Sequence, residues 1–132
     1  MARVVFMGTP EFGVPALEAL ARQHEIVMVV TQPDRAAGRG RQQMAESAVK
    51  QTALALGLPI LQPASLRRDA AAVEALRRVE AEVFVIAAFG QILRPNVLAI
   101  PPRGCIGVHA SLLPRYRGAA PIAAAAPNGL PP

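Results

Sequence analysis

Apolar residues recur along this chain in five short runs, separated by segments in which they return at helical spacing. The runs predict five strands, at residues 3–7, 25–31, 59–62, 82–88 and 104–109. A first helix is predicted around Pro15, where Leu17, Leu20 and Ala21 share one face. Further helices are predicted at residues 46–56, 69–78 and 95–99. Residues 32–43 are polar and rich in glycine, and they predict a loop.

Strands that alternate with helices indicate right-handed βαβ units and a parallel sheet. The predicted fold class is therefore α/β, a Rossmann-like open parallel sheet with strand order 3-2-1-4-5 and flanking helices. Ligands of such sheets bind beyond the carboxyl ends of the strands, where the strand order reverses. Three segments, at residues 8–12, 89–93 and 109–114, are expected to meet there.

The bulk composition fits one folded domain. The chain has 132 residues, 52% of them hydrophobic, and a mean hydropathy of +0.31. No apolar run approaches the ~20 residues that a membrane span needs, and we expect neither a signal peptide nor a membrane partner. A single cysteine, Cys105, leaves no disulfide framework, so we expect a cytoplasmic protein, monomeric by default.

The net charge of +5 is carried by thirteen arginines and one lysine, Lys50. This excess is either a background of arginine-rich composition or the mark of a polyanionic partner such as RNA. Three of the arginines, Arg35, Arg39 and Arg41, lie in the glycine-punctuated segment 33–43. They form either a solvated surface loop or an arm that binds phosphate groups, because the arginine fork fits phosphate oxygens.

The converging segments carry few chemical groups. Residues 8–13 space their glycines as in a phosphate-binding loop, but Val14 and Pro15 stand where lysine and Ser or Thr are needed. A tight strand-to-helix turn is the better interpretation. Residues 89–93 are either an ordinary strand exit, with Ile92 and Leu93 packed in the core, or the wall of a ligand crevice.

His109 follows the fifth predicted strand directly. A histidine at that position is either a structural residue with satisfied hydrogen bonds or a catalytic group held over the crevice. Two motifs follow it: Ser111-Leu112-Leu113-Pro114 and Arg117-Gly118-Ala119-Ala120-Pro121. These motifs resemble the signature of the 10-formyltetrahydrofolate-dependent formyltransferases. Within that family the chain looks most like the methionyl-tRNA formyltransferases.

The resemblance implies a role for each segment. His109 would be the catalytic histidine. The folate co-substrate, 10-formyltetrahydrofolate, would be held by Phe89, Gly90, Gln91, Ile92, Leu93, Ser111, Leu112, Leu113 and Pro114. The Gln-Pro-Asp-Arg and Ala-Gly-Arg-Gly motifs resemble the family's loop that contacts the acceptor stem of methionyl-tRNA. By this resemblance, the acceptor stem would be contacted by Arg35, Arg39 and Arg41. No metal is implied.

The chain also departs from the family pattern. Gly107 stands where the family has an asparagine, a later aspartate and a carboxyl-terminal β-barrel have no counterpart, and residues 123–127 read Ala-Ala-Ala-Ala-Pro. We therefore expect residues 1–132 to be a single, truncated and altered amino-terminal folate-binding domain, inactive or nearly so. The alternatives are a non-catalytic folate- or RNA-binding module, or a formyltransferase acting on another amine.

Overall fold

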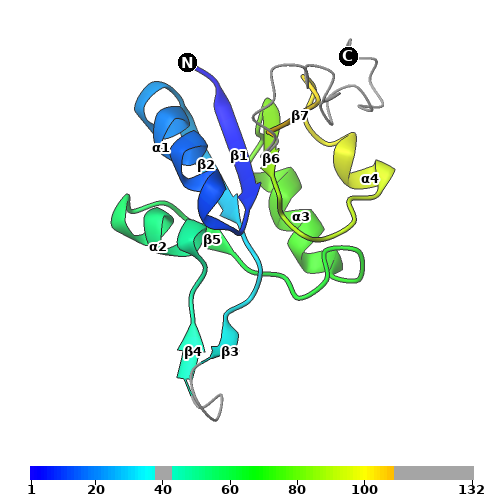
Figure 1. Cartoon of the computed structure of the whole chain (residues 1–132). Helices are drawn as coiled ribbons and strands as arrows, with labels where there is room; N and C mark the ends of the chain where they lie inside the picture. Colours follow the sequence, from blue (N-terminus) through cyan, green and yellow to red (C-terminus); the bar gives the residue numbers. More distant parts are fainter. Residues whose placement is uncertain (38–42, 109–132) are drawn as a thin grey trace, which may run out of the picture.

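The structure is a computed structural model that describes residues 1–37 and 43–108 (Figure 1). Its elements are, in chain order, β1 Arg3–Gly8, η1 Glu11–Gly13, α1 Val14–Gln23, β2 Glu25–Val30, β3 Arg35–Ala37, β4 Gln43–Ala45, α2 Ala48–Ala55, β5 Ile60–Leu61, α3 Ala70–Arg78, β6 Val83–Ala87, α4 Pro95–Leu98 and β7 Cys105–Gly107.

Five strands form one parallel sheet in the order β5-β2-β1-β6-β7. Strand β1 lies in the centre, where Phe6 pairs with Val29 of β2 and with Val85 of β6. This order is the predicted 3-2-1-4-5, so the predicted fold class is confirmed. The chain order reverses between β1 and β6, and the carboxyl ends of both strands open at the same edge.

Alternate residues of β1 face two different apolar layers. Val4 and Phe6 pack in a cluster with residues of α1 and α2, whereas Val5 and Met7 pack with residues of α3 and α4. Figure 1 shows the same arrangement, with α1 and α2 on one face of the sheet and α3 and α4 on the other. Burial on both faces explains why the strand sequences read as continuous apolar runs.

Two helices begin where a side chain accepts a hydrogen bond from the first turn. Ser47 Oγ accepts from the backbone N–H of Lys50 at 3.0 Å, and Asp69 Oδ1 accepts from the backbone N–H of Ala72 at 2.9 Å. Such caps satisfy donors that have no partner within the helix. Helix α2 therefore begins at Ala48, two residues after the predicted start.

The predicted loop at residues 32–43 is in part a strand ribbon, so this prediction was wrong. Strand β3 pairs antiparallel with β4, and Arg35 lies opposite Ala45. The residues of both strands are mainly small or polar and lack the β-branched pattern that marks strands. The ribbon projects away from the parallel sheet (Figure 1).

Some predictions fall at the end of the described residues. The fifth predicted strand is observed as Cys105–Gly107, and Val108 is the last residue before the undescribed segment 109–132. The single domain over residues 1–132 therefore stays a prediction. Within the described residues, no helix is both long and apolar enough to cross a bilayer.

Leu76 tests the packing of α3 on the sheet. Its side chain is completely buried, and Leu76→Ala is expected to lower the free energy of unfolding by about 2–5 kcal/mol, because it leaves a cavity in a layer that cannot fully close. Leu54→Ala is the control: Leu54 is 53% exposed on α2, and its loss is expected to cost no more than about 0.5 kcal/mol. Urea unfolding of both variants measures the difference, and equal losses would contradict this packing.

Candidate functional site

The side chain of Gln91, four residues beyond β6, links three loops at the carboxyl edge of the sheet. Its Nε2 donates to Gln32 Oε1 and to the backbone carbonyl of Pro63, both at 2.8 Å, and lies 3.3 Å from the carbonyl of Ala64. Its Oε1 accepts from the backbone N–H of Leu66 at 2.7 Å. Both ends of the Gln91 amide are thus engaged within the protein.

This network also fixes which way the amide of Gln32 points. The carbonyl of Pro63 accepts from Gln91 Nε2 and so fixes this atom as a donor, and the atom of Gln32 that faces it must be the acceptor Oε1. The backbone of Gln32 is engaged as well: its N–H donates to Thr9 Oγ1 at 3.3 Å, and its carbonyl accepts from Gln62 Nε2 at 3.1 Å. Nε2 is the one polar atom of Gln32 without a partner among the described residues.

Because Gly90 has no side chain, it leaves space for the side-chain amide of Gln32. A Cβ added at Gly90 would lie 2.8 Å from Gln32 Nε2, and the φ of +90° at Gly90 is one that other residues rarely adopt. The glycine is therefore required both by the local backbone and by the neighbouring side chain. Gln32 and Gly90 lie against each other across the end of β1.

A chain of hydroxyl groups ties the same edge together. Thr9 Oγ1 donates to the carbonyl of Phe89 at 3.2 Å, and the hydroxyl of Thr31 contacts Thr9 Oγ1 at 3.5 Å and Ser47 Oγ at 2.8 Å. Thr31 is completely buried. The ends of β1, β2 and β6 and the start of α2 are therefore held in one hydrogen-bonded frame.

The turn after β1 is shaped by close packing. A Cβ at Gly8 would lie 2.8 Å from the carbonyl oxygen of Ala87 in β6, and the next turn is the short helix η1. Gly8 thus permits the close approach of two strands. This confirms the interpretation of residues 8–13 as a tight strand-to-helix turn.

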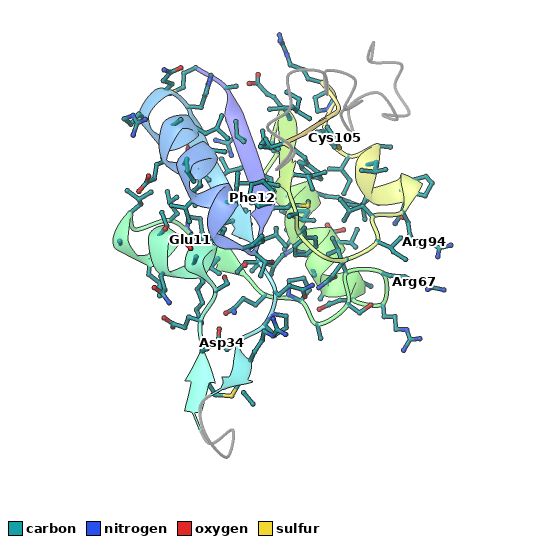
Figure 2. The ribbon with its side chains drawn as sticks, viewed as in Figure 1. Glu11, Phe12, Asp34, Arg67, Arg94 and Cys105 are labelled. Carbon is teal, nitrogen blue, oxygen red and sulfur yellow. The ribbon has the colours of Figure 1, made fainter. Side chains whose placement is uncertain are left out.

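The ribbon β3–β4 is anchored at its root by Asp34 (Figure 2). Both carboxylate oxygens of Asp34 accept from Lys50 Nζ at 3.0 Å, and Oδ1 also accepts from Gln62 Nε2 at 2.9 Å. The hydrogen bond from Gln62, and then that from Lys50, hold the pKa of Asp34 below its ordinary value of 3.8. The bond with Asp34 in turn raises the pKa of Lys50 above 10.5.

Two cavities lie at this edge. One, of about 460 Å³, is lined by the root of the ribbon and the ends of β1 and β2: Thr9, Gln32, Pro33, Asp34 and Arg35. The other, of about 270 Å³, is lined by Ala64, Ser65, Arg67, Gly90, Gln91 and Ile92. Gln32 lines the first and Gln91 the second, so the hydrogen bond between their amides joins the linings of the two cavities.

The side chains of the predicted crevice residues 89–93 differ in how deeply they are buried. Phe89 is 2% exposed and belongs to the core, and Leu93 is half-buried against it. Ile92 is 73% exposed beside the smaller cavity, so of the two alternatives the ordinary strand exit, which would pack Ile92 in the core, does not hold for this residue. An exposed isoleucine beside a cavity favours a ligand wall at that point.

The other predicted site residues are only partly described. Arg35, the first residue of β3, is exposed, and none of the ion pairs found in residues 1–37 and 43–108 involves it. The remaining predicted site residues lie outside the described residues: Arg39, Arg41, His109, Ser111, Leu112, Leu113 and Pro114. Their roles stay predictions.

Sequence reasoning missed Gln32 and Gln62. Gln32 stands two residues after β2, and Gln62 follows β5 directly. A polar residue just beyond a buried strand was the available signal, because the carboxyl ends of parallel strands meet at one edge. The side-chain network itself could not have been read from their spacing.

Cys105 does not belong to the hydrogen-bond network described at the carboxyl edge of the sheet. Its side chain is completely buried in the core at the start of β7, and burial raises the pKa of the thiol to about 11. A thiol that stays protonated at neutral pH is a poor nucleophile. Cys105 acts as a small core residue.

Fold and site together define an open parallel α/β domain, covered by helices on both faces of its sheet, with two cavities at its switch point. The solved structure of glycinamide ribonucleotide transformylase 1 from Symbiobacterium toebii has this fold: the TM-score is 0.61 at 20% identity, over 88% of this chain and 55% of that chain. Phosphoribosylglycinamide formyltransferase from Streptococcus pneumoniae TIGR4 gives 0.61 at 17% identity, over 88% and 61%.

The family follows from the sequence. The formyl transferase family model matches residues 2–130, and the chain belongs to that family. A methionyl-tRNA formyltransferase of Stenotrophomonas maltophilia (strain K279a) is 59% identical over 120 residues, which is 91% of this chain and 38% of the relative. That of Moorella thermoacetica is 54% identical over 128 residues, 96% of this chain and 40% of the relative. The chain spans about two fifths of the length of these relatives.

The anchor at Asp34 gives a pH prediction. Because the pKa of Asp34 is lowered on folding, its contribution to stability is complete above pH 3.8 and is lost as the pH falls through the folded-state pKa. Because the pKa of Lys50 is raised, its contribution is complete below pH 10.5 and is lost as the pH rises through the folded-state value. An NMR titration of the carboxyl carbon of Asp34 should give a midpoint below 3.8, and Gln62→Leu should raise it. A midpoint at or above 3.8 would contradict the anchor.

Proposed function

We propose that this chain carries the folate- and RNA-binding crevice of an enzyme that transfers a formyl group from 10-formyltetrahydrofolate to the amino group of methionyl-tRNA. The observation that carries the proposal is the pair of cavities at the switch point, whose linings are joined by the hydrogen bond between Gln32 and Gln91. A transferase must hold donor and acceptor side by side. Membership of the formyl transferase family and relatives named methionyl-tRNA formyltransferase support it. A cytoplasmic location and a monomeric state belong to the same proposal.

The folate donor is assigned to the smaller cavity. Backbone groups of Gly90 and Gln91 offer hydrogen bonds along its wall, and Ile92 offers an exposed apolar surface. A flat heterocycle needs this combination of polar edge contacts and apolar cover. Phe89 shapes the wall from within the core, and Leu93 supports it. We assign residues 111–114 to the same pocket from the family resemblance.

The RNA acceptor is assigned to the side of the ribbon. Arg35 is exposed at the start of β3, beside the larger cavity, and Asp34 fixes the root of the ribbon through Lys50 and Gln62. An arginine on an anchored arm suits a phosphate backbone, because the phosphate then meets a positioned cation. We assign Arg39 and Arg41 to the same contact.

The reaction needs an oxyanion donor and a route for one proton. The amine nitrogen attacks the formyl carbon, a tetrahedral intermediate forms, and the bond to N10 of the folate breaks. The attacking amine loses a proton and N10 gains one, so the reaction balances without a further reactant. We assign the proton transfer to His109, because an imidazole exchanges protons near neutral pH.

We propose that turnover by this chain is slow, for a reason that lies at Gly107. Gly107 is the last residue of β7, opposite Ile86 of β6, and it has no side chain to offer the oxyanion. The family resemblance expects an asparagine amide at this position. Removal of one such donor lowers the rate about 10²–10³-fold.

Folate binding is tested by a thermal melt with 5-formyltetrahydrofolate. At about 100 times its dissociation constant the ligand should stabilise the fold by about 2.7 kcal/mol, a rise in Tm of roughly 10 °C. Ile92→Ser should reduce this rise, whereas Leu54→Ser, which changes an exposed leucine on α2, should preserve it. A cooperative melt that folate does not shift would count against the assignment and favour an RNA-binding module.

The role of position 107 is tested by single-turnover formylation of methionyl-tRNA. Gly107→Asn should raise the rate about 10²–10³-fold, because it supplies the missing amide. Gly57→Asn is the matched control. Gly57 has a φ of +71°, which asparagine tolerates, and no atom within 4 Å of its Cβ position. Unchanged rates in Gly107→Asn would refute the assignment of the slow turnover to this residue.

A further inference from the structure

A third cavity, of about 330 Å³, lies along helix α3. Three arginines line it, Arg67, Arg68 and Arg77, together with Glu74 of α3 and Asn96 of α4. All three arginines are exposed. The arginine fork pairs with the oxygens of a carboxylate or a phosphate, so this cavity is suited to a ligand that carries several anionic groups.

Positive charge dominates this cavity. Among the described residues, Glu74 is the one acidic residue of its lining, and its carboxylate lies 3.5 Å from Nε of Arg78 on the same helix. Asp69, which precedes α3, accepts from the backbone N–H of Ala72 as the cap of the helix. The three lining arginines therefore outnumber the lining carboxylate, whose charge is already compensated in part.

The third cavity continues from the smaller cavity, because Arg67 belongs to both linings. The backbone that carries Arg67 is fixed. Its neighbour Leu66 is 1% exposed, and the N–H of Leu66 donates to Gln91 Oε1 at 2.7 Å. A ligand in the smaller cavity that extends past Arg67 would therefore enter a row of guanidinium groups.

We propose that the third cavity binds the glutamate tail of the folate co-substrate and favours folates whose tail is extended by further glutamates in γ-linkage. This inference rests on the proposed function and deepens it. A single glutamate has two carboxylates, and each γ-linked residue adds one. Arg68 and Arg77 do not line the smaller cavity, so they are the side chains that a longer tail would reach.

The wall of the cavity suits such a chain. Ala70, Val73, Glu74 and Arg77 share one face of α3, because they follow one another at helical spacing. The two apolar residues give cover for the methylene groups between the carboxylates, and Arg77 gives a cation at the far end of the face. An extended chain with regularly placed carboxylates can therefore pack along the helix and pair with its arginines.

The position of the third cavity favours a folate tail over the RNA. None of the residues that line the larger cavity, at the root of the ribbon, also lines the third cavity. In Figure 2, Arg67 lies on the side of α3, whereas Asp34 marks the root of the ribbon. The residue that the third cavity shares is Arg67, with the cavity that we assign to folate.

Two folates are titrated against the full chain by calorimetry at low ionic strength. One is 5-formyltetrahydrofolate with a single glutamate, and the other is the same folate with three γ-linked glutamates. The longer folate should bind about fivefold more tightly, because each exposed ion pair contributes a small factor and two are gained. In about 0.5 M salt this advantage should shrink, since exposed charges are screened.

Arg77→Gln should reduce the advantage of the longer folate about twofold, and the further change Arg68→Gln should bring it close to one. Both variants should keep the affinity of the unchanged chain for the single-glutamate folate. Arg22→Gln is the matched control. Arg22 is exposed in the last turn of α1, and α1 packs on the other face of the sheet. This variant has the same change in net charge as Arg77→Gln and should keep the full advantage.

The outcomes separate the inference from the proposed function. Equal affinity of the unchanged chain for both folates overturns the inference and leaves the folate assignment standing. An equal loss in Arg22→Gln and Arg77→Gln also overturns it, because net charge alone would then attract the tail. A double variant that keeps the full advantage but weakens binding of an acceptor-stem RNA overturns it and assigns the cavity to RNA. If the unchanged chain binds neither folate, the proposed function and the inference fail together.

Discussion

Strand β1 is buried on both faces and pairs in parallel with β2 on one side and with β6 on the other. Both partners run in the same direction as β1, so the loops that follow all three strands leave the sheet at one edge. Thr9, Gln32 and Phe89 come from these three loops, and their hydrogen bonds join the loops into one frame. Positions up to 80 residues apart in sequence are thereby held within hydrogen-bonding distance. Every feature of the crevice depends on this pairing.

The edge of a parallel sheet is rich in backbone groups that regular structure leaves without partners. Here amide side chains provide partners for several of these groups. The Gln91 amide bonds to the carbonyl of Pro63 and the backbone N–H of Leu66, and the Gln62 amide donates to the carbonyl of Gln32. Glutamine is suited to this, because one side chain can donate and accept at once. Asp34 and Lys50 extend the same frame to the ribbon. The frame therefore adds side-chain hydrogen bonds to the apolar packing of Phe89 and Leu66 at this edge.

The sequence predicted the sheet well, because burial on both faces leaves continuous apolar runs and the βαβ handedness leaves few topologies. It failed at the ribbon, where Arg35–Ala37 and Gln43–Ala45 pair without any local strand signal. It left Ile92 open between core packing and the wall of a ligand crevice, and only the structure shows that this side chain is exposed. The roles of Gln32 and Gln62 depend on partners 59 and 28 residues away, Gln91 and Asp34, which no local spacing reveals.

The group transfer that we propose for this family member would set opposite demands on one crevice. The substrates must be close enough to react, yet each must be recognised by groups that the other does not occupy. A side-chain bridge meets both demands better than a backbone wall, because it is thin and presents different atoms to its two sides. In the Gln32–Gln91 pair, both ends of the Gln91 amide bond to the frame, whereas Nε2 of Gln32 has no partner among residues 1–37 and 43–108. The asymmetry of the pair follows from the carbonyls of Pro63 and Ala64, which force the nitrogen of Gln91 toward them and so turn the nitrogen of Gln32 away from Gln91.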